Sequence, residues 1–198
     1  MTGFDLKTFI QAVGYLGIFG IIFAESGFFF GFFFPGDSLL FTAGFLASQG
    51  FFNIGALVAG SFIAAVAGVS FGYAVGRRLG EKVFTKEEGI FFHKKNLERA
   101  RIFYEKYGKK AIVFARFVPV IRSFAPTLAG VGKMNYPSFI FYNIIGGALW
   151  AGGFLLLGYF LGNTIPDADR YLLPIIALII IISFVPVIIH FIKEKKQK

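Results

Sequence analysis

The sequence predicts an all-α membrane protein: an inverted repeat with two opposed re-entrant helical hairpins, about three spanning helices and amphipathic interfacial helices. Three observations carry this prediction. Of the 198 residues, 56% are hydrophobic and only 16% are charged, which is typical of polytopic membrane proteins. Turn-forming and ionisable residues interrupt two of the apolar runs, and the two halves of the chain resemble each other weakly. We treat residues 1–198 as a single membrane domain.

The first interrupted run extends from Gly17 to Gly50, after a short amphipathic opening. Glu25 lies inside this run, and Pro35, Gly36 and Asp37 form a strong turn signal within hydrophobic sequence. We therefore predict a re-entrant hairpin with Pro35 and Gly36 near its tip. Such backbone is tolerated at membrane depth only when it is buried in protein or lines a wet cavity.

The next stretch, Asn53 to Gly76, is uncharged and about as long as a membrane span. Glycine and alanine recur along it, and small residues at this density favour close helix packing in lipid. The polar connector that follows, about residues 77–110, has the spacing of an amphipathic helix at the membrane face. A solvated helical loop fits the same residues, so both interpretations stay open.

The second interrupted run, Ala111 to Gly132, holds two arginines and three expected hairpin breakers: Arg116, Arg122, Pro119, Pro126 and Gly130. A straight helix would place side chains six residues apart about 240° around its axis. Because Pro119 removes a helical hydrogen bond, a broken hairpin could instead turn both guanidinium groups towards one point. An arginine at the bilayer centre costs about 2.5–3.5 kcal/mol on insertion scales, which favours a functional role. The alternative is that both side chains snorkel to the interface.

Two further spans are expected at Tyr136 to Asn163 and at about residues 171–192. Eleven of the 20 basic residues lie between Arg77 and Lys110, and four more lie in the C-terminal tail. The positive-inside rule therefore places the loop 77–110 and the C-terminus on the cytoplasmic side of a bacterial-type inner or plasma membrane. The same distribution explains the net charge of +9 without a nucleic-acid partner.

The internal repeat pairs residues about 5–76 with residues about 94–163. At an offset of 91 Glu25 falls on Arg116, and at an offset of 86 glycines match at several positions: Gly44 with Gly130, Gly72 with Gly158 and Gly76 with Gly162. One hairpin carries carboxylates and the other carries arginines, and pairing between them would lower the cost of burying charge. Inverted repeats with broken helices that meet at the membrane midplane are a transporter architecture.

An ordered set of residues resembles the DedA family, which belongs with the SNARE-associated (VTT-domain) membrane proteins. The set consists of Glu25, the Phe-Phe-Pro-Gly-Asp run ending at Asp37, Arg116-Phe-Val-Pro-Val-Ile-Arg122, Ala129-Gly130, Met134, Phe139, Asn143, Gly147 and Trp150. The resemblance covers about Tyr15 to Gly162. It implies two opposed re-entrant hairpins and lipid translocation, since bacterial members are linked to undecaprenyl phosphate recycling or phospholipid movement and eukaryotic relatives to lipid scrambling. It also implies that Glu25, Asp37, Arg116 and Arg122 are essential.

The leading hypothesis is a transporter or flippase of an anionic membrane lipid, above all undecaprenyl phosphate. Arg116 and Arg122 would bind the phosphate, because forked guanidinium donors suit a phosphate group. Glu25 and Asp37 would couple transport to protons, since burial disfavours a charged carboxylate and a nearby arginine favours it. The alternative is that the two acids only neutralise the arginines.

Other classes of protein remain as alternatives. A phospholipid flippase or scramblase would need the same anion site, whereas two buried arginines would repel the substrate of a small-ion or drug/proton antiporter. A membrane lipid phosphatase is less favoured, because the only two histidines, His93 and His190, lie far in sequence from the arginines. A non-transporting assembly factor is not excluded. We expect no enzyme activity, no cofactor and no metal, and the oligomeric state is left open.

Overall fold

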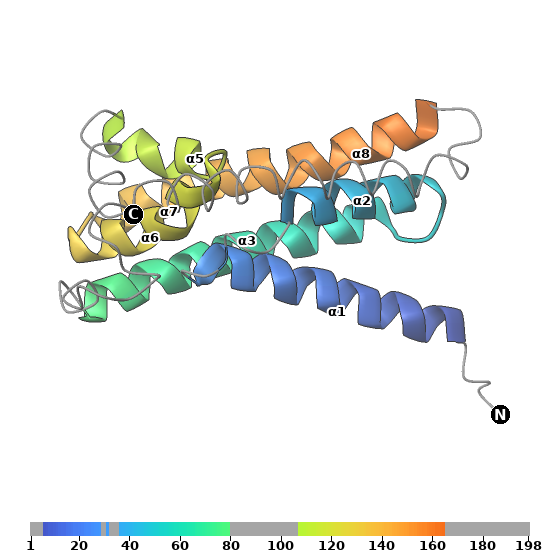
Figure 1. Cartoon of the computed structure of the whole chain (residues 1–198), viewed down its shortest axis with the longest axis horizontal. Helices are drawn as coiled ribbons and strands as arrows, with labels where there is room; N and C mark the ends of the chain where they lie inside the picture. The colour runs from blue at the N-terminus through green and yellow to red at the C-terminus, as the bar shows by residue number, and fades with distance from the viewer. Residues whose placement is uncertain (1–5, 29–30, 32–35, 80–106, 165–198) are drawn as a thin grey trace, which may run out of the picture. The chain divides into compact units, whose positions relative to one another are not determined.

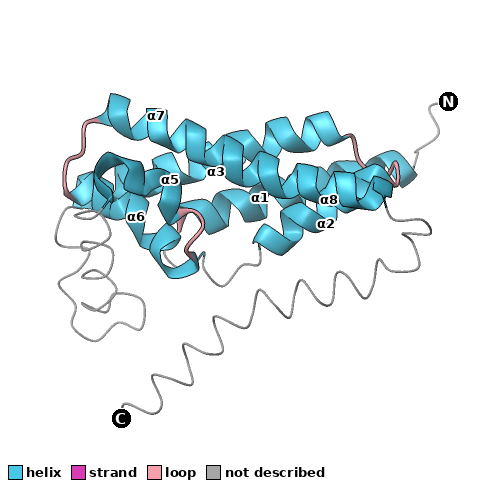
Figure 2. Cartoon of the chain, turned by 90° about the horizontal axis from the view of Figure 1, so that it is seen from above, coloured by secondary structure: helices cyan, strands magenta, loops and turns pink. Residues whose placement is uncertain are grey.

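The computed structural model describes residues 6–28, 31, 36–79 and 107–164, and the regular structure of these residues is helical, with no strand (Figures 1 and 2). The α-helices are α1 (Leu6–Gly27), α2 (Gly36–Ser48), α3 (Ile54–Leu79), α5 (Ala111–Ala115), α6 (Pro119–Val131), α7 (Tyr136–Gly147) and α8 (Gly153–Thr164). A 3-10 turn, Gly108–Lys110, precedes α5, and a π-helical turn, Ala148–Gly152, joins α7 to α8. The predicted all-helical class is confirmed.

Within the described residues, two helices are long and apolar enough to cross a membrane. They are Ile54–Leu79, with 26 residues, and the helix Tyr136–Thr164, with 29 residues, which runs through the π-helical turn. At about 1.5 Å per residue, 26 residues extend about 39 Å, which exceeds the roughly 30 Å hydrocarbon core. These helices lie where the sequence predicts its first two spans. The third expected span, residues 171–192, and most of the connector 77–110 lie outside the described residues.

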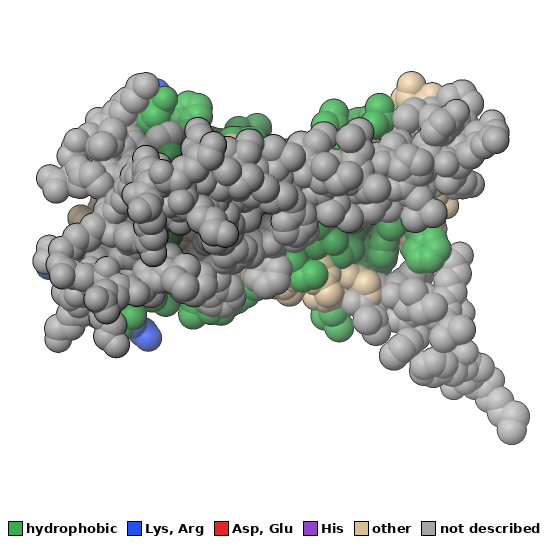
Figure 3. Space-filling view, in the orientation of Figure 1, with side chains coloured by type: hydrophobic (Ala, Val, Ile, Leu, Met, Phe, Trp, Pro, Cys, Tyr) green, Lys and Arg blue, Asp and Glu red, His purple; other side chains and the backbone are tan. Residues whose placement is uncertain are grey.

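Contacts divide the chain into two compact units, which we describe separately. Unit 1 takes Met1–Ile18, Pro35–Gly60 and Gly153–Lys198, and unit 2 takes Phe19–Phe34 and Ser61–Gly152. Helices α1 and α3 each contribute residues to both units, whereas α2 and α8 belong to unit 1 and α5, α6 and α7 to unit 2. In the space-filling view, hydrophobic side chains make up most of the described surface that is visible (Figure 3).

In unit 1, α2 packs against α8 through glycines. A side chain at Gly44 would collide with the carbonyl group of Leu155, and one at Gly158 with the carbonyl group of Phe41. The side-chain amide of Gln49 donates a hydrogen bond of 3.3 Å to the carbonyl oxygen of Gly162. The two helix backbones therefore approach each other as closely as small residues permit in lipid.

In unit 2, α6 and α7 pack against α3, and α5 packs against α6 and α7. A side chain at Gly130 on α6 would collide with the carbonyl oxygen of Tyr73, and Thr127 Oγ1 donates a hydrogen bond of 3.2 Å to the carbonyl oxygen of Gly72. One cluster of buried hydrophobic residues in this unit contains Val69, Tyr73, Ile112, Ala129 and Phe139. The rings of Tyr73 and Phe139 stack with centroids 4.3 Å apart, so α7 is held on α3 as well.

The second expected hairpin, Ala111 to Gly132, is interrupted before Pro119 but not at Pro126 or Gly130. Helix α5 ends at Ala115, Val118 is extended, and Pro119 begins α6, where its missing N–H costs no helical bond. The helix then continues through Pro126 and Gly130, so the expectation that these two residues break it is corrected. Pro126 removes one hydrogen bond, but its turn of α6 is packed on α3, and Gly130 permits close packing. In the first hairpin, α2 begins at Gly36, and Pro35 lies outside the described residues.

Candidate functional site

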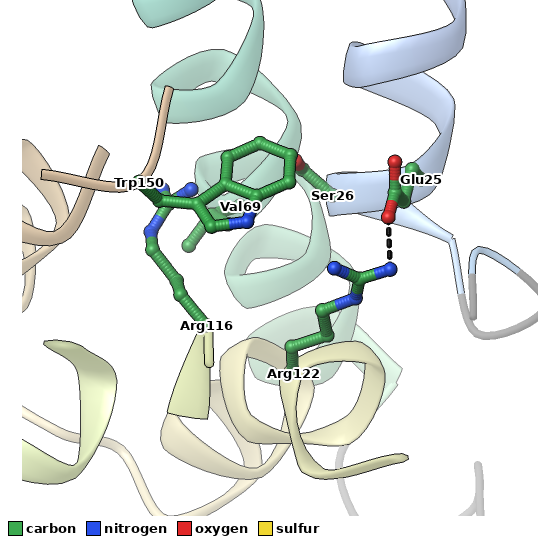
Figure 4. Close-up of a pocket in the computed structure, with 6 residues that line it drawn as sticks. All are labelled: Glu25, Ser26, Val69, Arg116, Arg122 and Trp150. Atoms are coloured by element: carbon green, nitrogen blue, oxygen red, sulfur yellow. Dashed lines mark ion pairs between the residues drawn. The ribbon is translucent and has the colours of Figure 1, made fainter. Parts of the chain in front are cut away.

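A pocket inside unit 2 collects polar side chains from four parts of the chain (Figure 4). Its cavity volume is about 20 Å³, enough for roughly one water molecule. The residues that line it are Glu25, Ser26, Val69, Arg116, Arg122 and Trp150. Sites for drug-sized ligands usually measure about 300–1,000 Å³, so this cavity is far too small for such a ligand.

The break between α5 and α6 brings the two arginines to this pocket. Arg116 directly follows α5, and Arg122 lies in the first turn of α6, where its backbone N–H donates to the carbonyl oxygen of Val118 at 2.9 Å. Because Val118 is extended, the six-residue spacing does not follow a single helical path. Both guanidinium groups therefore line one pocket instead of opposite faces of a helix.

Arg122 forms an ion pair with Glu25, which lies near the end of α1 (Figure 4). The side chain of Glu25 is only 1% exposed and that of Arg122 10%. Removing two charges from water is costly, and a buried pair recovers that cost only through close contact and additional hydrogen bonds. This ion pair joins α1 to α6 within unit 2.

Arg116 is also buried, but no carboxylate of the described residues forms an ion pair with it. Its Nη2 donates a hydrogen bond of 2.6 Å to Oδ1 of Asn143 and a longer one of 3.4 Å to the carbonyl oxygen of Ala65. Its Nε, which is buried, has no hydrogen-bond partner among the described residues. Arg116 is only 5% exposed, so its positive charge lies in the interior of the unit beside neutral hydrogen-bond acceptors.

Trp150 contacts both arginines. The guanidinium carbon of Arg116 lies 5.9 Å from the centroid of the indole, and that of Arg122 lies 5.8 Å from it, both within cation–π range. The π-helical turn Ala148–Gly152 presents this ring, and such turns often occur at functional sites. Gly146 leaves the room that the Arg116 side chain occupies, since a Cβ there would lie 3.0 Å from Cδ of Arg116.

Comparison with known proteins places the chain in a family. The model of the VTT domain matches residues 34–160. The chain is 43% identical to "Protein DedA" of Escherichia coli K12 over 184 residues, which are 92% of this chain and 84% of that protein. The chain belongs to the DedA family. It is also 42% identical to an uncharacterized membrane protein of Mycobacterium leprae over 169 residues, 85% of this chain and 75% of that one. An uncharacterized membrane protein of Synechocystis is 36% identical over 132 residues, 66% of this chain and 61% of its own length. No solved structure matches.

Membership of the DedA family confirms the resemblance found in the sequence, and together with the apolar helices it identifies a membrane protein. Of the four ionisable residues singled out, three line the same pocket: Glu25, Arg116 and Arg122. The fourth, Asp37, lies in the first turn of α2 in unit 1.

Two residues of this DedA-family site were not assigned a role from the sequence. Asn143 and Trp150 contributed only to the family resemblance, yet each contacts a guanidinium group. Asn143 offered a usable signal, because an amide in the middle of an apolar span must find hydrogen-bond partners inside the protein. Trp150 offered less, since a tryptophan in a membrane helix is more often an interfacial anchor.

Proposed function

We propose that this protein transports an anionic membrane lipid, and that a phosphate headgroup such as that of undecaprenyl phosphate binds between Arg116 and Arg122. The observation that carries the proposal is the buried guanidinium of Arg116, whose hydrogen bonds go to neutral acceptors. A buried charge is costly without a counter-charge, and an anionic headgroup would supply one. The planar donors of arginine match the oxygens of a phosphate.

The dimensions of the pocket support a headgroup site rather than a site for a whole lipid. A cavity of about 20 Å³ excludes a polyprenyl or acyl chain, and the lining side chains would have to move apart to admit a phosphate. The chain would stay in the bilayer while the pocket carries the headgroup. A phospholipid flippase or scramblase is the alternative within this class, because a phosphodiester presents the same kind of oxygens.

We further propose that the chain forms the two re-entrant hairpins predicted from its sequence. Helices α2 and α6 each have 13 residues. They extend only about 20 Å, too short for the roughly 30 Å hydrocarbon core. Pro119 begins α6 and does not lie inside a continuous spanning helix, which agrees with a hairpin broken at that residue.

The inverted repeat is part of the same proposal, and the glycine contacts support it. Gly44 of α2 and Gly158 of α8 pack against the partner helix in unit 1. Their matches in the repeat, Gly130 of α6 and Gly72 of α3, pack against the partner helix in unit 2. Corresponding helices therefore pair through corresponding glycines. Repeats of this kind with broken helices are a transporter architecture.

Proton coupling through Glu25 and Asp37 remains the proposed driving mechanism. Glu25 is suited to it because a phosphate that binds Arg122 would compete with the carboxylate for the same guanidinium. The ion pair equally favours the alternative that Glu25 only neutralises Arg122. The proposed orientation, with residues 77–110 and the C-terminus cytoplasmic in a bacterial-type inner membrane, concerns residues that lie almost wholly outside the described ones.

The decisive experiment measures binding and transbilayer movement separately, with the full chain in lipid nanodiscs and in vesicles. Labelled polyprenyl phosphate, phosphatidylglycerol and uncharged polyprenol serve as the three ligands. Because Lys keeps the charge but loses the fork, Arg116→Lys and Arg122→Lys should weaken polyprenyl phosphate binding roughly ten- to a hundredfold. Arg78→Lys is the matched control, since Arg78 is exposed at the end of α3.

The ligand comparison also separates the candidate substrates. Preference for polyprenyl phosphate over phosphatidylglycerol would support the leading substrate, and the reverse preference would support the phospholipid alternative. If both pocket variants bind and move the phosphate lipids as the parent does, the arginines are not the binding site and the proposal is wrong.

A further inference from the structure

Asn143 makes three side-chain hydrogen bonds next to the pocket. Its Oδ1 accepts the hydrogen bond of 2.6 Å from Nη2 of Arg116. Its Nδ2 donates to the carbonyl oxygen of Val66 at 3.0 Å and to Oγ of Ser70 at 3.2 Å. Ser70 Oγ itself donates to the carbonyl oxygen of Val66 at 2.8 Å, so it is available as an acceptor for the amide. Asn143 itself is fully buried, whereas its partners Val66 and Ser70 are half-buried.

This network allows only one orientation of the amide. Turning it over would direct its NH₂ group at a guanidinium, which only donates, and its oxygen at a carbonyl oxygen, which only accepts. Asn143 therefore fixes Arg116 to α3 through a neutral acceptor. The two arginines of the pocket differ in this respect, because a carboxylate holds Arg122 and an amide holds Arg116.

We propose that Asn143 is a positioning residue that sets the anion affinity of the site. It holds the guanidinium of Arg116 in place and leaves its positive charge for the bound headgroup. This inference rests on the proposed function. An acid at the same position would fix Arg116 equally well but would neutralise it, so the choice of an amide over a carboxylate selects for an anionic ligand.

The substitution that tests this is Asn143→Asp, which is nearly isosteric. An ionised Asp pairs with Arg116 and cannot donate to the carbonyl oxygen of Val66, whereas a protonated Asp can both accept and donate as Asn does. Anion affinity should therefore be low where the new carboxyl is ionised and recover as it becomes protonated. The other charged groups that line the pocket, among the described residues, are Glu25 and Arg122, and the α3 residues that bond Asn143 are the neutral Val66 and Ser70. Glu25 and Arg122 are present in both proteins, so comparing the variant with the parent at each pH removes their contribution to the pH dependence of the affinity.

The probe is farnesyl phosphate, a short polyprenyl phosphate, titrated into the full chain in nanodiscs. Trp150 is the only tryptophan of the chain and contacts both guanidinium groups, so its fluorescence reports on the pocket. At a pH where the new carboxyl is ionised, Asn143→Asp should bind at least about tenfold more weakly than the parent, equivalent to about 1.4 kcal/mol. The deficit should shrink as the pH falls. Asn163→Asp adds the same charge at an exposed position on α8 and should leave the affinity unchanged.

Each outcome decides the matter. Parent-like affinity of Asn143→Asp at every pH, or a deficit that does not change with pH, overturns the proposal. If Asn143→Asp does not fold, Asn143→Ala replaces it: weaker binding by a folded protein supports the role, and unchanged binding overturns it. If the parent itself binds no farnesyl phosphate, the proposed function fails together with this inference. If the parent binds farnesyl phosphate and the Asn143 variants bind it with the same affinity, the proposed function stands and this inference alone is wrong.

Discussion

A methyl group added at Gly68 should disturb the pocket by steric overlap alone. A Cβ there would lie 2.5 Å from the carbonyl oxygen of Phe23 and 2.9 Å from Cβ of Ser26, both on α1. Ordinary van der Waals contact begins at 3.4 Å, so the end of α1 would have to withdraw by roughly 1 Å. That end carries Glu25, so Gly68→Ala should strain the ion pair with Arg122.

The expected magnitude follows from overpacking, which typically costs about 1–3 kcal/mol. Replacing Gly by Ala inside a helix also raises its stability by about 0.5–1 kcal/mol, so a control variant with the same replacement is needed. Gly20→Ala on α1 is that control, since no described atom would lie within 4 Å of the new methyl group. The free energy of unfolding of Gly68→Ala should therefore be about 1–3 kcal/mol lower than that of Gly20→Ala.

Denaturant unfolding in detergent micelles measures the difference, and transport of polyprenyl phosphate in vesicles measures its functional effect. A shift of about 1 Å at a functional group can lower a rate by up to about a hundredfold. The transport rate should therefore fall markedly in Gly68→Ala and not in Gly20→Ala. Equal stability and equal transport in the two variants would refute the packing argument, because α1 would then have room that the structure does not show.

Two further predictions concern coupling and orientation. Glu25→Gln and Asp37→Asn keep the shape of the side chains but cannot ionise. They should therefore reduce the pH dependence of transport more than they weaken lipid binding. Retention of the full pH dependence would exclude proton coupling through these acids. Because the chain has no native cysteine, single cysteines at Lys94 or Lys95 and in the C-terminal tail give a clean topology test. Neither should react with an impermeant reagent in intact cells, and labelling of both would reverse the predicted orientation.

The sequence by itself determined the class of the protein and the identity of its unusual residues. Hydropathy over some twenty residues reflects the bilayer thickness, so α3 and the helix Tyr136–Thr164 lie where the composition predicts them. The family was recognisable from the order of its charged and turn residues. The break at Pro119 was also predictable, because a missing N–H and a fixed φ act on the local backbone whatever surrounds it.

Only the tertiary structure decided how far each helix continues and which groups meet. Pro126 has the same chemistry as Pro119, yet α6 continues through it where it is packed on α3. Glu25 and Arg122 form an ion pair although they lie on helices far apart in the chain, α1 and α6. Asn143 holds Arg116 from a helix that the sequence marked only as a span. Such partners are set by the close approach of helices through glycines, which orders side chains that are distant in the chain. Local sequence shows that a buried charge needs a partner, but packing determines which partner it has.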